Sequence, residues 1–217
     1  MNSVRVLLLL THGLLASIVV AGHEPLRQAA APAEASQVVE QMRGFSLRLS
    51  AAPSDGKADP VQRRRIAIIK SLRRLGEGAL PALTRALSDP DVQMRRNAAL
   101  ALINLGGGYP AEALPRLDIR EATSALIRAT EDADADVRAW AAHALGEMGP
   151  GAAPAIPALV RLLGDKEEGP RNTGCLALGR IGRVAKEALP ALREALQDPS
   201  RDVRGFARQA IEEIGRP

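Results

Sequence analysis

The sequence contains little of several residue types that usually carry catalysis or crosslinks. Of its 217 residues, one is cysteine, three are histidine and only 2% are aromatic. The single thiol, Cys175, cannot form a disulfide within the chain, so packing alone must hold the fold together. No phosphate-binding glycine loop, serine nucleophile elbow or paired-carboxylate motif occurs, which argues against the enzyme classes built on them.

The histidines are also too scattered for most metal chemistry. Only His143 lies in the body of the chain, because His12 and His23 fall near its start. One histidine cannot build the histidine-rich clusters that hold most catalytic metals. We therefore expect no metal site, no cofactor and no catalytic residues.

Long blocks of one charge are absent as well. The 29 basic and 25 acidic residues are interspersed and leave a formal charge of +4. This mixture is weak support for a polyanion partner, although the arginine content keeps a nucleic-acid-binding domain as one alternative.

The first 22 residues are predicted not to belong to the fold. Arg5 precedes an uncharged run of seventeen residues that ends in small side chains at Ala21 and Gly22. This pattern indicates a signal peptide over residues 1–22, with an uncleaved membrane anchor over residues 4–22 as the alternative. Both place the rest of the chain outside the cytoplasm, as a periplasmic or secreted protein or one tethered to the membrane.

One arginine recurs in a fixed frame through the remainder. Each copy follows an aspartate by six residues and precedes a glycine by eleven, and the last three copies are 33 residues apart: Arg65, Arg95, Arg138, Arg171 and Arg204. Self-similarity at this period indicates a repeat array, which predicts a binding scaffold before it predicts an enzyme.

Each repeat reads as two helices. The first begins with a proline, as at Pro81, Pro157 and Pro190, and ends in a polar turn that contains the aspartate. The second carries the arginine. Positions three, seven and ten residues after the arginine are apolar or small and share one helical face, so we expect them to be buried. The glycine at position eleven is expected to end the second helix.

These repeats resemble HEAT repeats, and more closely the short variety of the phycobiliprotein (PBS) lyases. The likeness rests on the prolines, on Ala144-Leu145-Gly146 and Ala177-Leu178-Gly179, and on four aspartate–arginine pairs, Asp89/Arg95, Asp132/Arg138, Asp165/Arg171 and Asp198/Arg204. It implies an all-α fold, a right-handed α-solenoid of about five helix pairs over residues 57–217. It also implies that the pairs form a structural hydrogen-bonded ladder, which suits the planar donor fork of arginine.

Two parts of the chain depart from the repeat. Ten extra residues lie within 107–120, a stretch that contains the only tyrosine, Tyr109, and whose role the sequence leaves open. Residues 23–56 read as a linker with a possible capping helix over 38–49. In the last repeat, Arg208 stands where earlier repeats have small residues, which is typical of an end cap.

The best candidate site lies on the face of the second helices that is expected to line the inner curve. Trp140, His143 and Glu147 are spaced three and four residues apart on one helix, with Asn104 and Arg180 at matching positions on its neighbours. Exposed aromatics are enriched at binding surfaces. The alternative is that Trp140 packs against the first helix and His143 is merely solvated.

Together these features predict a non-catalytic scaffold that binds a protein or peptide partner outside the cytoplasm. Two alternatives remain at this point. The resemblance allows a bilin lyase-like or isomerase-like activity, or a chaperone activity, on a chromoprotein, although pigment attachment is intracellular and the export signal argues against it. The other is the nucleic-acid-binding HEAT-like domain.

Overall fold

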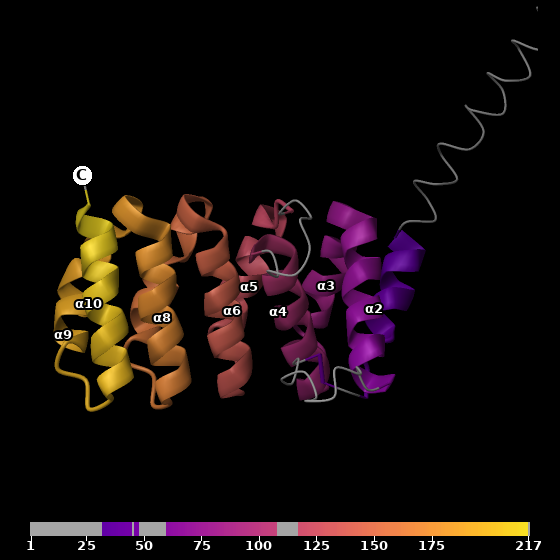
Figure 1. Ribbon diagram of the computed structural model, residues 1–217, viewed down its shortest axis with the longest axis horizontal. Helices are drawn as coiled ribbons and strands as arrows, with labels where there is room; N and C mark the ends of the chain where they lie inside the picture. Colours follow the sequence, from indigo (N-terminus) through magenta and orange to yellow (C-terminus); the bar gives the residue numbers. More distant parts are fainter. Residues whose placement is uncertain (1–31, 45, 48–59, 108–116, 217) are drawn as a thin grey trace, which may run out of the picture.

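The computed structural model describes residues 32–44, 46–47, 60–107 and 117–216, which form a row of paired helices (Figure 1). The first helices of the pairs are residues 32–40, α3 (Leu80–Ala86), α5 (Thr123–Ala129), α7 (Ile156–Leu162) and α9 (Leu189–Ala195). The second helices are α2 (Pro60–Leu75), α4 (Val92–Gly107), α6 (Ala135–Glu147), α8 (Glu168–Ile181) and α10 (Arg201–Gly215). The predicted α-solenoid of about five pairs is confirmed.

Short 3₁₀ helices connect one pair to the next: η1 (Gly76–Ala79), η2 (Arg120–Ala122), η3 (Gly149–Ala155) and η4 (Gly182–Ala188). Gly149 and Gly182 have φ angles of 56° and 72°, a left-handed conformation that glycine adopts without a steric penalty. The predicted glycine stop is wrong for Gly106 and Gly215, because α4 and α10 include these residues.

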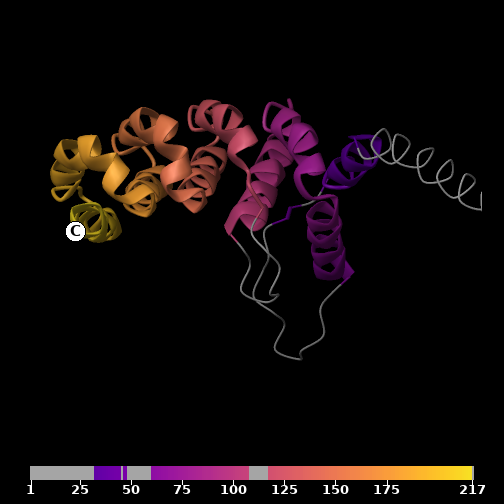
Figure 2. The ribbon, with the colours of Figure 1, turned by 90° about the horizontal axis from the view of Figure 1, so that it is seen from above.

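The row of pairs is curved, and Figure 2 shows the second helices α4 to α10 on the inner side of the arc. The predicted apolar stripe forms the core between the two layers. Three and seven residues after the arginines, most of these side chains are at most 2% exposed: Ile68, Ala98, Ala141, Leu72, Leu102, Leu145 and Leu178. The prediction of full burial is wrong for Leu75, Met148 and Ile211, which are half-buried at the edge of the core. Cys175 is fully buried between repeats, as its position predicts.

Neighbouring second helices approach each other closely because their contact positions carry small residues. A Cβ atom added at Gly146 would lie 2.9 Å from the Cα of Ala177 on the next helix. No real Cβ contact is that short, so this crossing requires glycine. The close approach brings the inner-face side chains of adjacent repeats within reach of one another.

The N-terminal cap differs from the prediction in its bounds. Its helix spans residues 32–40 rather than 38–49, because Pro32 stands at its start and Gly44, with φ of 81°, lies in the turn that follows. Met42 within this turn and Leu47 beyond it are both buried. The segment that carries them lies against α4, where it covers a side chain that the repeat pattern places on the inner face, Asn97.

Several predictions fall outside the described residues. They are the signal or anchor at residues 1–22, most of the linker at 23–56, and the loop around Tyr109. Within the described ranges, no helix combines the length and the hydropathy that crossing a membrane requires.

Candidate binding site on the inner face

The aspartate–arginine pairs form a ladder along one end of the stack. In three successive junctions, the arginine Nε and Nη2 atoms donate to both carboxylate oxygens of the aspartate in the following repeat, at 2.7–3.1 Å: Arg95 to Asp132, Arg138 to Asp165 and Arg171 to Asp198. The third nitrogen, Nη1, donates to two carbonyls of the arginine's own turn. For Arg138, these are the carbonyls of Asp132 and Ala133, at 2.9 and 3.1 Å.

These rungs are shielded from solvent. The side chains of Arg138 and Asp165 are only 8% and 11% exposed. Hydrogen bonding from Arg171 holds the pKa of Asp198 below its ordinary value, so this carboxylate stays ionised at neutral pH. Because the guanidinium and carboxylate groups of the inner rungs saturate one another, they are not available to a ligand.

The first rung departs from the pattern. Asp89 accepts from Arg43 of the N-terminal cap, with Arg43 Nη2 at 3.0 Å from its Oδ2 atom, and not from the in-frame Arg65. The Nε atom of Arg65 is buried and has no hydrogen-bond partner among the described residues. A residue outside the repeats therefore completes the ladder at its N-terminal end.

Asn97 of α4 explains how the cap is held in place. Its side chain is fully buried, its Oδ1 accepts from the Leu47 backbone N–H at 2.7 Å, and its Nδ2 donates to the Met42 carbonyl at 2.8 Å. Asn97 follows Arg95 by two residues, as Trp140 follows Arg138, so the repeat pattern predicts that it is exposed on the inner face. This prediction is wrong, because the cap segment covers Asn97. A buried amide that bridges two backbone groups fixes the segment on α4.

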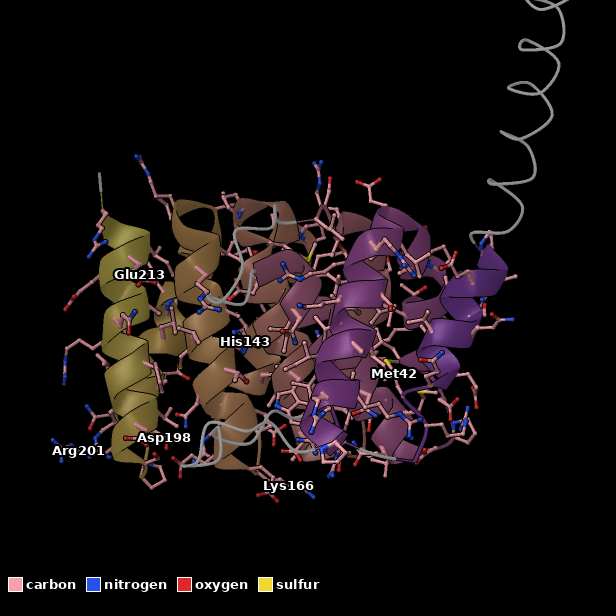
Figure 3. All side chains as sticks on the ribbon, turned by 45° about the vertical axis from the view of Figure 1, so that its right-hand side comes forward. Met42, His143, Lys166, Asp198, Arg201 and Glu213 are labelled. Atoms are coloured by element: carbon pink, nitrogen blue, oxygen red, sulfur yellow. The ribbon has the colours of Figure 1, made fainter. Side chains whose placement is uncertain are left out.

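Three of the five candidate inner-face residues meet in one cluster. Glu147 Oε1 lies 3.2 Å from His143 Nε2, one turn away on α6, and also accepts from Arg180 Nη1 of α8. Figure 3 shows His143 midway along the helices, whereas Asp198 lies at their lower end with the ladder. The cluster and the ladder are therefore separate surfaces.

Burial sets the charge of this cluster. The pKa of His143 lies below its ordinary value, chiefly because burial disfavours the charged ring and secondly because Arg180 is nearby; Glu147 opposes both effects. The ring is therefore neutral at pH 7. The Glu147 side chain is only 12% exposed, and its charge is balanced by Arg180, whose side chain is 37% exposed.

The other two candidates do not share the hydrogen bonds of this cluster. Trp140 is half-buried and packs against the hydrophobic core, so part of its ring remains accessible. Asn104 turns its amide back to the Leu100 carbonyl of its own helix at 2.7 Å. The Trp140 ring therefore combines core contact with an accessible portion, and its contact with a partner stays a prediction.

A shallow hollow beside Glu147 was not anticipated. It has a volume of about 220 Å³ and is lined by Gly106, Leu117, Asp118, Ile119, Arg120, Glu147 and Met148. The end of the ten-residue insertion forms one wall, since Ile119 packs into the space above Gly106. The Gly106-Gly107 pair is the sequence signal for this approach, because side chains there would collide with Ile119 and Glu147.

The described residues contain no group of three or more histidine, cysteine, aspartate or glutamate side chains placed to hold a metal ion. The inner face carries a partly accessible indole ring, a neutral imidazole and a partly exposed guanidinium group.

Comparisons with known proteins agree with this architecture. HEAT repeats match residues 110–174, and the PBS lyase HEAT-like repeat matches residues 176–198. No curated protein matches the chain in sequence. The complex of CpcE and CpcF of phycocyanin lyase from Nostoc sp. PCC7120 is similar in structure, with 20% identity and a TM-score of 0.60, over 82% of this chain and 98% of that chain. Computationally designed armadillo repeat proteins for modular peptide recognition share 22% identity and a TM-score of 0.58, over 83% of this chain and 82% of that chain.

Proposed function

Because this chain carries HEAT repeats, we propose that it is a non-catalytic scaffold that binds a protein or peptide partner along its inner face. The observation that carries this proposal is the strip formed by Trp140, His143, Glu147 and Arg180 on two adjacent second helices. The similar designed armadillo proteins, made for modular peptide recognition, support a binding role for this kind of surface.

The strip is suited to an uncharged or weakly charged peptide. His143 is neutral and Glu147 is balanced by Arg180, so a partner meets little net charge at the centre. The Trp140 ring is held by core contacts and loses little freedom on binding, which favours affinity. The free edge of Arg180 can donate hydrogen bonds to peptide carbonyls.

The test is quantitative capture of partners by the parent chain and by Trp140→Ala. We expect the substitution to reduce capture by about 30-fold, as for a contact of about 2 kcal/mol, with an unchanged far-ultraviolet circular dichroism spectrum. Val184→Ala is the matched control, because Val184 is an apolar side chain 51% exposed outside the strip. Equal capture by Trp140→Ala and the parent removes the strip as the site, and a loss of helicity would assign Trp140 to the core.

We also propose that the scaffold acts outside the cytoplasm, directed there by residues 1–22. The support is the uncharged run that follows Arg5 and ends in small residues. Intact-mass measurement of the protein from its native host is expected to show loss of 21 or 22 residues. Full-length chain in the membrane fraction would favour an anchor over residues 4–22, and full-length chain in the cytosol would exclude both.

The match to the PBS lyase HEAT-like repeat and the similarity to CpcE and CpcF favour a second candidate, a lyase-like or chaperone activity on a chromoprotein. To distinguish this candidate from the scaffold, the purified chain is incubated with an apo-phycobiliprotein and free bilin. A visible absorbance band that survives denaturation of the chromoprotein would support this candidate, and its absence would leave the scaffold.

A further inference from the structure

Within the described residues, Arg204 is the last arginine of the ladder. Arg204 Nη1 donates to the carbonyls of Asp198 and Pro199 at 2.6 and 2.9 Å, the same pair of turn carbonyls that inner rungs use. Among the described residues, no carboxylate accepts from its Nε and Nη2 atoms, which bind the next aspartate in every inner rung. The Nη1 contacts thus hold the guanidinium group as in the inner rungs, with its Nε and Nη2 atoms not bonded to a carboxylate of the described residues.

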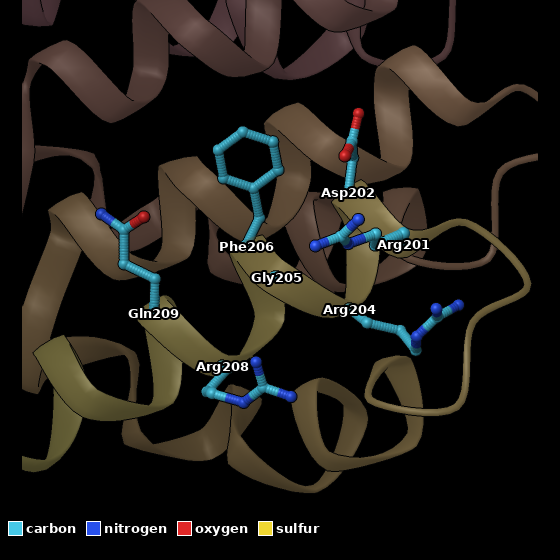
Figure 4. Close-up of a pocket in the computed structure, with 7 residues that line it drawn as sticks. All are labelled: Arg201, Asp202, Arg204, Gly205, Phe206, Arg208 and Gln209. Atoms are coloured by element: carbon cyan, nitrogen blue, oxygen red, sulfur yellow. The ribbon is translucent and has the colours of Figure 1, made fainter.

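Arg204 is one of the residues that line a basic hollow of about 670 Å³ on the surface of α10 (Figure 4). Arg201, Arg204 and Arg208 contribute three positive charges to its lining, against one negative charge from Asp202, and Phe206 and Gln209 complete one side. Arg208 and Gln209 are exposed, and Phe206 is half-buried. The surface is therefore cationic and polar with one aromatic ring.

We propose that this C-terminal end binds an acidic segment of a partner protein, with one carboxylate bound bidentately by Arg204 and further acidic side chains near Arg201 and Arg208. An acidic segment within the chain already binds arginine side chains in this way and indicates the kind of ligand expected. Asp132 sits in the acidic stretch Thr130–Asp136 and receives the Arg95 fork, while Asp134 in the same stretch receives the fork of Arg96.

The occupant is neither a sixth repeat nor a second copy of the chain stacked end to end. Inner repeats place Ala99, Ala142 or Cys175, all fully buried, where the last repeat has the exposed Arg208. A following helix pair would bury that charge without a partner, which is unfavourable. A second copy would offer Asp89 as the first acceptor of its ladder, and Arg43 already occupies that carboxylate.

Fluorescence anisotropy with a labelled, end-capped peptide of residues 130–136, TEDADAD, tests the proposal on the full chain. We expect a dissociation constant below about 1 mM, weakened roughly tenfold by Arg204→Lys, which keeps the charge but loses the planar fork. Arg208→Glu leaves the Arg204 contacts to the turn intact and is expected to weaken binding at least as much by charge reversal. Arg193→Ala, at an exposed arginine of α9 outside the hollow, is the matched control and should bind as the parent does.

Three outcomes would overturn the proposal: no binding of TEDADAD, equal binding of the peptide with asparagine at its three aspartate positions, or equal binding by Arg204→Lys. Full competition by a single-stranded DNA pentanucleotide, which carries the same four charges as the peptide, would assign the surface to polyanions in general. Trp140→Ala is expected to bind the peptide normally, so failure of the inner-face function and failure of this site are distinguishable.

Discussion

Replacing Arg138 with alanine is expected to destabilise the array by about 3 kcal/mol, the cost typical of removing one partner from a buried ion pair. The guanidinium group makes two hydrogen bonds to Asp165 and two to carbonyls of its own turn. Its removal leaves a carboxylate that is only 11% exposed with one remaining backbone donor, the Glu167 N–H. The free energy of unfolding falls mainly because the Asp165 carboxylate stays buried without its cationic partner.

The terminal rung provides a matched control for this substitution. Arg204 makes the two carbonyl hydrogen bonds but bonds to no aspartate of the described residues, so Arg204→Ala is expected to cost about 1 kcal/mol. The difference between the two variants measures the bidentate pair with Asp165. Urea unfolding followed by circular dichroism gives both free energies of unfolding, and overlapping fluorescence and dichroism curves would establish that the transition is two-state.

Two results would refute this reasoning. Equal losses for Arg138→Ala and Arg204→Ala would show that the pair with Asp165 contributes nothing to stability. An unchanged midpoint for Arg138→Ala together with lost partner capture would show that the ladder serves binding and not structure.

Further predictions concern packing, reactivity and pH. Gly146→Ala is expected to cost about 1–3 kcal/mol in urea unfolding because its Cβ meets the backbone of the next helix, whereas Gly169→Ala, where nothing lies within 4 Å, should be neutral or slightly stabilising. Burial raises the pKa of Cys175 to about 12, so alkylation by iodoacetamide at pH 8 should be undetectable in the folded chain and complete in guanidinium; comparable rates would contradict this. The pKa of Asp198 is lowered by Arg171, so its contribution to stability is present above the unfolded value of about 3.9 and lost as the pH falls through the lower folded value. Urea midpoints measured from pH 6 to pH 2 should therefore decrease in this acidic range and less so in Arg171→Lys.

The sequence predicts the solenoid well because the same pattern of apolar, polar and glycine positions recurs in each repeat. Leu102, Leu145 and Leu178 occupy the same position in three repeats and are buried in all three. Asn97 shows where this logic fails. Its repeat position faces the inner curve, but a segment 50 residues earlier in the chain covers it, and no periodic pattern encodes a contact that occurs once.

The candidate site was predictable in part for the same reason. The spacing of His143 and Glu147 on one helix follows from the helical period, and Arg180 lies at the same repeat position as Glu147, so their meeting follows from the stacking. The sequence did not predict the burial of Glu147, because this burial depends on how closely neighbouring helices approach each other at small residues. The hollow at the Gly106 end depends on where the insertion returns to the stack, which sequence spacing does not determine.

The ladder also shows that the repeat array tolerates an insertion between two helix pairs. Arg95 and Asp132 are 37 positions apart, ten more than the 27 that separate the partners in the next two rungs, yet their hydrogen bonds are of similar length. The junction between α4 and α5 therefore absorbs ten residues while the Arg95–Asp132 rung of the ladder keeps its geometry. This point of the chain is a natural insertion site, where a tag, a reporter or a foreign binding loop can be exchanged while the helix pairs on both sides keep their register.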